Sequence, residues 1–174
     1  MDERVALIAG AGTGFSAAMA RALAARGTRV ALAARNVAKL GDVAAKTGAR
    51  TYACDVVEPE SVGRLFASVE DDLGAPDFVM FNASARVRGA FAELAAEDVR
   101  RALDVSAFGG FLVAREAVER MLPAGRGAIV LTGASASVKG YASSAPFAMG
   151  KFALRGMAQS MARELHPQGI HVLH

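Results

Sequence analysis

The sequence has one cysteine, no tryptophan, and aromatic residues at only 6% of its 174 positions. The single cysteine, Cys54, excludes an intrachain disulfide, and no cluster of cysteine and histidine indicates a metal site. The 20 basic and 17 acidic residues form no run of like charge, so neither a nucleic-acid-binding arm nor a membrane-binding patch is expected. The first apolar run, residues 5–10, is too short for a signal peptide or a membrane span. These absences favour a cytoplasmic protein whose partner is a small molecule.

Apolar runs of strand length alternate with longer helical patterns from one end of the chain to the other. The predicted strands cover residues 5–9, 30–34, 51–54, 78–82, 128–132 and 170–173. The predicted helices cover residues 16–26, 37–47, 60–73, 96–121 and 147–165. Each strand is a continuous apolar run, as expected for a parallel sheet that helices cover on both faces. The chain, with 53% hydrophobic residues, is therefore predicted to form one α/β domain over residues 1–174, a doubly wound parallel sheet in three α/β/α layers.

A glycine-rich turn joins the first predicted strand to the first predicted helix. It contains Gly10, Gly12, Thr13, Gly14 and Phe15. Glycines let backbone amides approach a ligand closely, and the N-terminus of a helix attracts a phosphate. The turn does not end in Gly-Lys-Ser/Thr, which excludes a nucleoside-triphosphate loop. Its position between a strand and a helix predicts a nucleotide cofactor site at the edge of the sheet where the strands end.

The residue after the second predicted strand distinguishes between possible cofactors. The spacing of Gly10, Gly12 and Gly14 also resembles the first motif of S-adenosylmethionine-dependent methyltransferases. Those enzymes and NAD-preferring dehydrogenases place a carboxylate after the second strand to bind ribose hydroxyls, whereas this sequence has Arg35. A guanidinium forms bidentate, charge-assisted hydrogen bonds with a phosphate such as the 2′-phosphate of NADPH. Arg35 therefore favours NADPH over NAD, and a dinucleotide over a methyl donor.

Three further segments, taken with the turn, resemble the short-chain dehydrogenase/reductase family. Asp55 and Val56 match the family's Asp-Val pair, Asn82 and Ala83 resemble its Asn-Asn-Ala-Gly motif, and Lys151 lies where the family carries its active-site lysine. The resemblance implies that Asp55 meets the adenine amino group, that Asn82 braces the sheet beside the adenine ribose, and that Lys151 binds the nicotinamide ribose. It also implies a Rossmann fold, oxidoreductase activity on a carbonyl or alcohol, and a homo-dimer or homo-tetramer.

The sequence departs from this family at the catalytic positions. The family's Tyr-x-x-x-Lys pair is Phe147 and Lys151 here, and Ser106 stands where the family has a catalytic asparagine. The family's catalytic serine aligns with Ala134, immediately beside Ser135. Phenylalanine keeps the aromatic ring but cannot donate the proton that carbonyl reduction needs.

Two interpretations therefore stay open. In the first, the protein is an NADPH-dependent oxidoreductase in which Lys151 or Tyr141 supplies the proton, or Ser135 polarises the carbonyl oxygen. In the second, it is an NADPH-binding pseudoenzyme with a sensing or scaffolding role. A hydrolase is not expected, because residues 133–137 lack the second glycine of a nucleophile elbow and the C-terminal histidines have no evident route to them. The sequence also stops before the family's substrate lid and seventh strand, so we expect a longer native protein that carries both and of which this sequence is a part.

Overall fold

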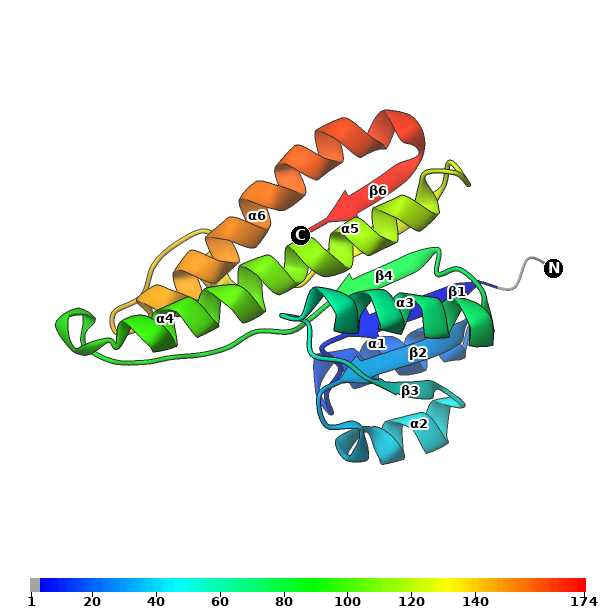
Figure 1. The fold of residues 1–174 in the computed structure, drawn as a ribbon, viewed down its shortest axis with the longest axis horizontal. Coiled ribbons are helices and arrows are strands. Elements are labelled where there is room, and N and C mark those ends of the chain that lie inside the picture. Colours follow the sequence, from blue (N-terminus) through cyan, green and yellow to red (C-terminus); the bar gives the residue numbers. More distant parts are fainter. Residues whose placement is uncertain (1–3) are drawn as a thin grey trace.

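The computed structural model describes residues 4–174 of the chain. These residues form a six-stranded parallel sheet with the strand order β3-β2-β1-β4-β5-β6 (Figure 1). The strands are β1 (Val5–Ala9), β2 (Arg29–Ala34), β3 (Arg50–Ala53), β4 (Phe78–Phe81), β5 (Gly127–Leu131) and β6 (Ile170–Leu173). Each bound lies within one residue of its prediction, which confirms the doubly wound parallel sheet. The strand order reverses between β1 and β4, where such sheets bind their ligands.

Helices pack on both faces of the sheet (Figure 1). On one face, α1 (Phe15–Ala24), the 3₁₀ turn η1 (Val37–Leu40) and α2 (Gly41–Thr47) bury a cluster built on Ile8, Leu32 and Met80. On the other face, α3 (Pro59–Leu73), α5 (Gly109–Met121) and α6 (Ala145–Leu165) bury a larger cluster around Leu7 and Phe81. The shorter elements are η2 (Phe91–Glu93), α4 (Ala96–Leu103), η3 (Asp104–Phe108), η4 (Ser135–Ser137) and η5 (His166–Gln168). All five residues of β1 are buried, so the sheet is covered where the site forms.

Two predicted helices differ from the structure in a way that sequence periodicity does not reveal. Residues 37–47 divide into η1 and α2 between Leu40 and Gly41, and η1 begins where the Asn36 side chain accepts a hydrogen bond from the amide of Ala38 at 3.1 Å. Residues 96–121 divide into α4 and α5 around η3, which is a π-helical turn. A Cβ atom on Gly109, just after this turn, would stand 2.9 Å from Val56. The turn therefore lies where the helix packs closely against the chain that follows β3.

Within residues 4–174, no helix is both long and apolar enough to cross a lipid bilayer. The same residues contain no group of three or more histidine, cysteine, aspartate or glutamate side chains arranged to bind a metal ion.

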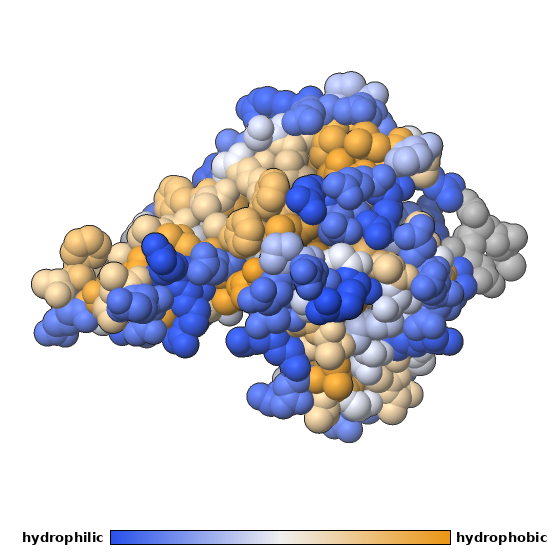
Figure 2. Space-filling model, in the orientation of Figure 1, coloured by the Kyte–Doolittle hydropathy of each residue, from blue (hydrophilic) through white to orange (hydrophobic). Residues whose placement is uncertain are grey.

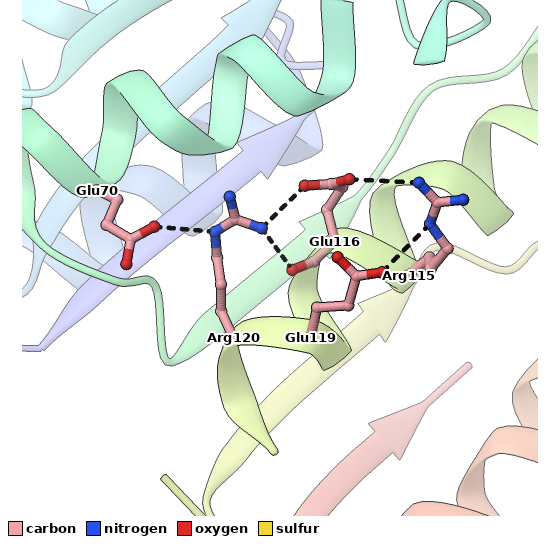
Figure 3. A network of polar contacts seen from close by, with 5 residues as sticks. All are labelled: Glu70, Arg115, Glu116, Glu119 and Arg120. Carbon is pink, nitrogen blue, oxygen red and sulfur yellow. Dashed lines mark hydrogen bonds and ion pairs between the residues drawn. The ribbon is translucent and has the colours of Figure 1, made fainter. Parts of the chain in front are cut away.

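A network of ion pairs joins α3 to α5 (Figure 3). Arg120 of α5 binds Glu70 of α3 at 3.1 Å and Glu116 of its own helix at 2.8 Å. Its guanidinium carbon also lies 5.1 Å from the ring centroid of Phe66, which belongs to the larger core cluster. The side chain of Arg120 is only 20% exposed, so water screens these contacts incompletely. The network therefore links the outer surface of two helices to the core between them.

The variant Arg120→Met should lower the free energy of unfolding by about 1 kcal/mol, because it removes a partly shielded ion pair and a cation–π contact. Arg115, whose ion pairs lie in the same network, is 51% exposed. Arg115→Met should therefore cost less than about 0.5 kcal/mol. Urea unfolding followed by circular dichroism measures both values. Equal losses in the two variants would show that the shielded contacts of Arg120 do not hold α3 against α5.

Candidate functional site

Two cavities, each of about 400 Å³, open at the edge of the sheet where the strands end. Eight residues predicted to bind the cofactor line the first cavity: Gly10, Gly12, Thr13, Arg35, Asp55, Val56, Asn82 and Ala83. Two of the predicted catalytic residues, Ser135 and Phe147, line the second cavity. The loop that follows β4 contributes to both, because Ala83 lines the first cavity and Arg86 lines the second.

The glycines of the first turn have different physical roles. Gly10 has a φ of +78°, and a Cβ atom there would stand 2.3 Å from the backbone nitrogen of Ala83. Its lack of a side chain therefore lets the turn approach the loop after β4. Gly12 and Gly14 would place a Cβ atom in open space, with nothing within 4 Å. They leave the first cavity open beside the N-terminus of α1, and no side chain caps that N-terminus.

This arrangement fits the phosphates of a dinucleotide. Bare backbone amides, the positive end of a helix dipole and an unobstructed approach are what a phosphate needs. Phe15 is the first residue of α1, and its side chain is 57% exposed rather than part of the cavity wall. Its contribution to a phosphate site would therefore come from its backbone.

Ser16 and Asn82 hold the turn to β4. Asn82 donates from its side-chain amide to the hydroxyl of Ser16 at 2.8 Å and to the carbonyl of Gly10 at 3.3 Å. Ser16 is 1% exposed, so this contact is buried. Ser16 lies where the family resemblance expects the last glycine of the turn. Unlike a glycine, it has a hydroxyl that accepts the hydrogen bond from Asn82. Asn82 acts as a brace, as the resemblance implies.

The wall of the first cavity beyond β2 is basic. Arg35 and Lys39 both line it, together with Asn36, whose side-chain oxygen is already used to cap η1. Asp55, which follows β3, also lines this cavity, and one of its carboxylate oxygens accepts a hydrogen bond from the amide of Val57 at 3.3 Å. Two cations at the end of β2 and one carboxylate at the end of β3 provide separate sites for a phosphate and for a hydrogen-bond donor.

Lys151 and Arg86 lie near the ring of Phe147. The guanidinium carbon of Arg86 is 4.5 Å from the ring centroid, and Nζ of Lys151 is 5.8 Å from it. Lys151 is only 3% exposed and donates a hydrogen bond to the carbonyl of Thr132 at 2.6 Å. Burial, and secondarily the charge of Arg86, lower the pKa of Lys151 to about 8. The pKa of this lysine therefore lies closer to physiological pH than that of a lysine in solvent.

The predicted catalytic serines occupy different environments. Ser106 is fully buried in the π-helical turn, where its hydroxyl accepts a hydrogen bond from the amide of Ala85 at 3.3 Å. It lines neither cavity and helps to position the loop after β4. Ser135 is exposed in the second cavity beside Tyr141. Hydrogen bonding to Ser135, with a smaller contribution from Lys139, lowers the pKa of the Tyr141 hydroxyl.

A third serine contradicts one expectation. Ser137 is 2% exposed, and its hydroxyl lies 3.3 Å from Nε2 of His174. A C-terminal histidine therefore does reach the segment after β5, contrary to the prediction that none had a route there. The Ser137 hydroxyl also accepts a hydrogen bond from the amide of Ala134 at 3.0 Å, so it closes a local turn.

Comparison with known proteins agrees with this geometry. Residues 4–174 match the family model described as short chain dehydrogenase. The chain belongs to this family. It is 30% identical to D-threitol dehydrogenase of Mycolicibacterium smegmatis over 99% of this chain and 68% of that protein.

Two solved structures have folds closely similar to that of this chain. The actinorhodin polyketide ketoreductase variant F189W with NADPH has a TM-score of 0.95 at 30% identity, covering 98% of this chain and 68% of the other. NAD⁺-bound xylitol dehydrogenase has a TM-score of 0.93 at 31% identity, covering 97% of this chain and 67% of the other. The Rossmann fold and the interpretation of the chain as an oxidoreductase are thereby supported, whereas the cofactors of these two structures differ.

Sequence reasoning missed two cations of this short-chain dehydrogenase. Lys39 lies four positions after Arg35, and the turn η1 places it beside Arg35 in the wall of the first cavity. Arg86 lies four positions after Asn82, in a loop whose course no periodic pattern predicts. Both follow strand ends, and an inspection of every charged residue within a few positions of a strand end would have included them.

The variant Gly12→Ala should bind NADPH more weakly while keeping its thermal stability, because the added methyl group enters the cavity and contacts nothing in the protein. An alanine there can even stabilise the fold slightly by reducing the entropy of the unfolded chain. Isothermal titration calorimetry and differential scanning fluorimetry separate the two effects. Gly10→Ala is the matched contrast and should lower the melting temperature. Unchanged NADPH affinity in Gly12→Ala would place the phosphates elsewhere.

Proposed function

We propose that this short-chain dehydrogenase is an NADPH-dependent oxidoreductase that acts on a carbonyl or alcohol group of a small molecule. The observation that carries the proposal is the paired placement of Arg35 and Lys39 at the end of β2, beside the open turn at the N-terminus of α1. Among the described residues that line this end of the cavity, no carboxylate follows β2 to accept hydrogen bonds from a 2′-hydroxyl. The choice of NADPH over NAD therefore rests on the charges of this chain.

We also propose which groups of the chain take part in the reaction. When bound, NADPH supplies a hydride to the carbonyl carbon of the substrate. The ammonium of Lys151 then provides the proton for the carbonyl oxygen through a water molecule and is protonated again from solvent. Phe147, at the position where the family resemblance expects tyrosine, packs beside this path and donates nothing. Ser135 and Tyr141 offer hydroxyl groups to the substrate from the wall of the second cavity.

We further propose a homo-oligomer that buries apolar side chains of the arm formed by α4, α5 and α6. The rings of Phe108 and Phe111 stack with centroids 6.2 Å apart, and each residue is 45% exposed. Met149 and Phe152 of α6 are also exposed. Figure 2 shows apolar residues among charged ones along this arm. Exposed aromatic pairs of this kind are characteristic of protein interfaces.

The variant Arg35→Ala should weaken NADPH binding about 10- to 100-fold, the value of a charge-assisted hydrogen bond to phosphate, and should change NADH binding little. Lys39→Met should act in the same direction. Arg21→Ala is the matched control, because Arg21 is exposed near the end of α1 and does not line the cavity. Titration calorimetry with both dinucleotides measures the effect. Equal losses for NADPH and NADH would contradict the proposed contact with the 2′-phosphate.

Carbonyl reduction should become slower above pH 8. The pKa of Lys151 is lowered to about 8, so its ammonium form is present below that pH and is lost as the pH rises through it. The groups that face it are Arg86, the carbonyl of Thr132, and His174, whose own pKa is lowered by burial, then by the charge of Lys151. Removing the like charge in Arg86→Met should raise the pKa of Lys151 and move the decline to higher pH. NADPH absorbance during reduction of a carbonyl panel measures the profile.

Three variants test this assignment. Lys151→Met should lower kcat/KM about 10²- to 10⁴-fold, the usual contribution of general acid catalysis. Tyr141→Phe should leave the decline above pH 8 in place, since Tyr141 is not the proposed donor. Phe147→Tyr should raise turnover by restoring a phenol beside Lys151. If no carbonyl in the panel oxidises NADPH although calorimetry shows that NADPH binds, the protein is a cofactor-binding protein without this activity.

A further inference from the structure

We propose that the second cavity selects substrates that carry a carboxylate, and that Arg86, supported by Arg88, is the residue that binds it. This inference rests on the proposed function for the identity of the reacting group, but the carboxylate site itself depends only on the geometry of the cavity. The site would make the protein an oxidoreductase of oxo or hydroxy acids rather than of neutral carbonyl compounds or polyols.

The guanidinium of Arg86 is held in place by an aromatic ring. Its central carbon lies 4.5 Å from the ring centroid of Phe147, within the range of a cation–π contact. A guanidinium that stacks on a ring keeps its N–H groups in its own plane, directed outward, where they can form two parallel hydrogen bonds with a carboxylate. The contact with Phe147 therefore leaves the N–H groups of Arg86 able to serve a ligand in the cavity that both residues line.

The charge of the cavity has one sign. Arg86 and Arg88 both line it, and none of the described residues in its wall is an aspartate or a glutamate. Lys139 adds a further cation nearby, with its Nζ 5.1 Å from the ring centroid of Tyr141. None of the ion pairs found within residues 4–174 neutralises Arg86 or Arg88. An anion entering this cavity would meet two arginines before any carboxylate of the protein.

Arg86 and Lys151 both lie close to the ring of Phe147. Both cations contact the same ring, Arg86 at 4.5 Å and Lys151 at 5.8 Å from its centroid. A substrate whose carbonyl lies toward Lys151 would therefore place a carboxylate a few bonds away within reach of Arg86. A cavity of about 400 Å³ accommodates a compact acid of this kind, including one with a six-membered ring.

Steady-state kinetics with two substrates of matched reactivity tests the proposal. 4-Oxocyclohexanecarboxylate and its methyl ester carry the same ketone. The acid group is far enough away that the reactivity of the ketone is matched, and the main difference between the two substrates is the negative charge. The wild-type protein should show a kcat/KM for the acid about 10- to 100-fold above that for the ester, as expected for charged hydrogen bonds to a carboxylate. Arg86→Met should remove this preference and leave the ester's kcat/KM much less affected. Arg100→Met, which removes an exposed arginine of α4 outside the cavity, should keep it.

A binding measurement separates this proposal from the proposed function. Cyclohexanecarboxylate and cyclohexanecarboxamide have no reactive carbonyl, so calorimetric titration into the protein saturated with NADPH, and into the protein alone, reports the anion site directly. The carboxylate should bind at least tenfold more tightly than the amide, and Arg86→Met should abolish the difference, whereas Arg86→Lys should retain part of it. Equal binding of acid and amide would overturn the carboxylate site even if ketones are reduced. Selective binding of the acid without any NADPH oxidation would support the site and refute the proposed reaction.

Discussion

Gly10 and Ala83 approach each other so closely that any side chain at position 10 would collide with the backbone of the loop after β4. Asn82 reinforces this approach by donating hydrogen bonds to Gly10 and to the buried hydroxyl of Ser16. The first turn is thereby fixed against the point where the strand order reverses, and the N-terminus of α1 is aimed into the first cavity. The proposed phosphate site and the start of the loop beyond Asn82 both depend on this contact.

Much of the fold could be predicted because parallel strands buried on both faces must be continuous apolar runs. The strands therefore have nearly the bounds that the sequence indicates. The π-helical turn at Ser106 could not be predicted in this way, because it lies where Gly109 packs against Val56, a contact distant in sequence. The subdivision of residues 37–47 was not predicted, because both parts are helical turns and the apolar pattern runs through the break between Leu40 and Gly41.

The candidate site also contains residues that could be predicted from local motifs and residues whose place depends on tertiary contacts. Residues in or beside a recognisable motif, such as Gly12, Asp55 and Asn82, do meet in one cavity, because strand ends in a parallel sheet converge at one edge. Ser106 has a supporting position that spacing alone could not distinguish from a catalytic one. The place of Arg86 in the second cavity could not be predicted, because the course of its loop depends on tertiary contacts, including the hydrogen bond from the amide of Ala85 to Ser106.

The loop after β4 forms part of the wall of both cavities, and this limits how the protein can be redesigned. A substitution at Ala83 or Ser84 changes the lining of the first cavity and also the anchor from which Arg86 extends into the second. Cofactor preference and substrate preference cannot be altered independently through this loop. Engineering that aims at one property alone has to work away from this loop, at Arg35 and Lys39 for the proposed cofactor contact or at Tyr141 for the proposed substrate cavity.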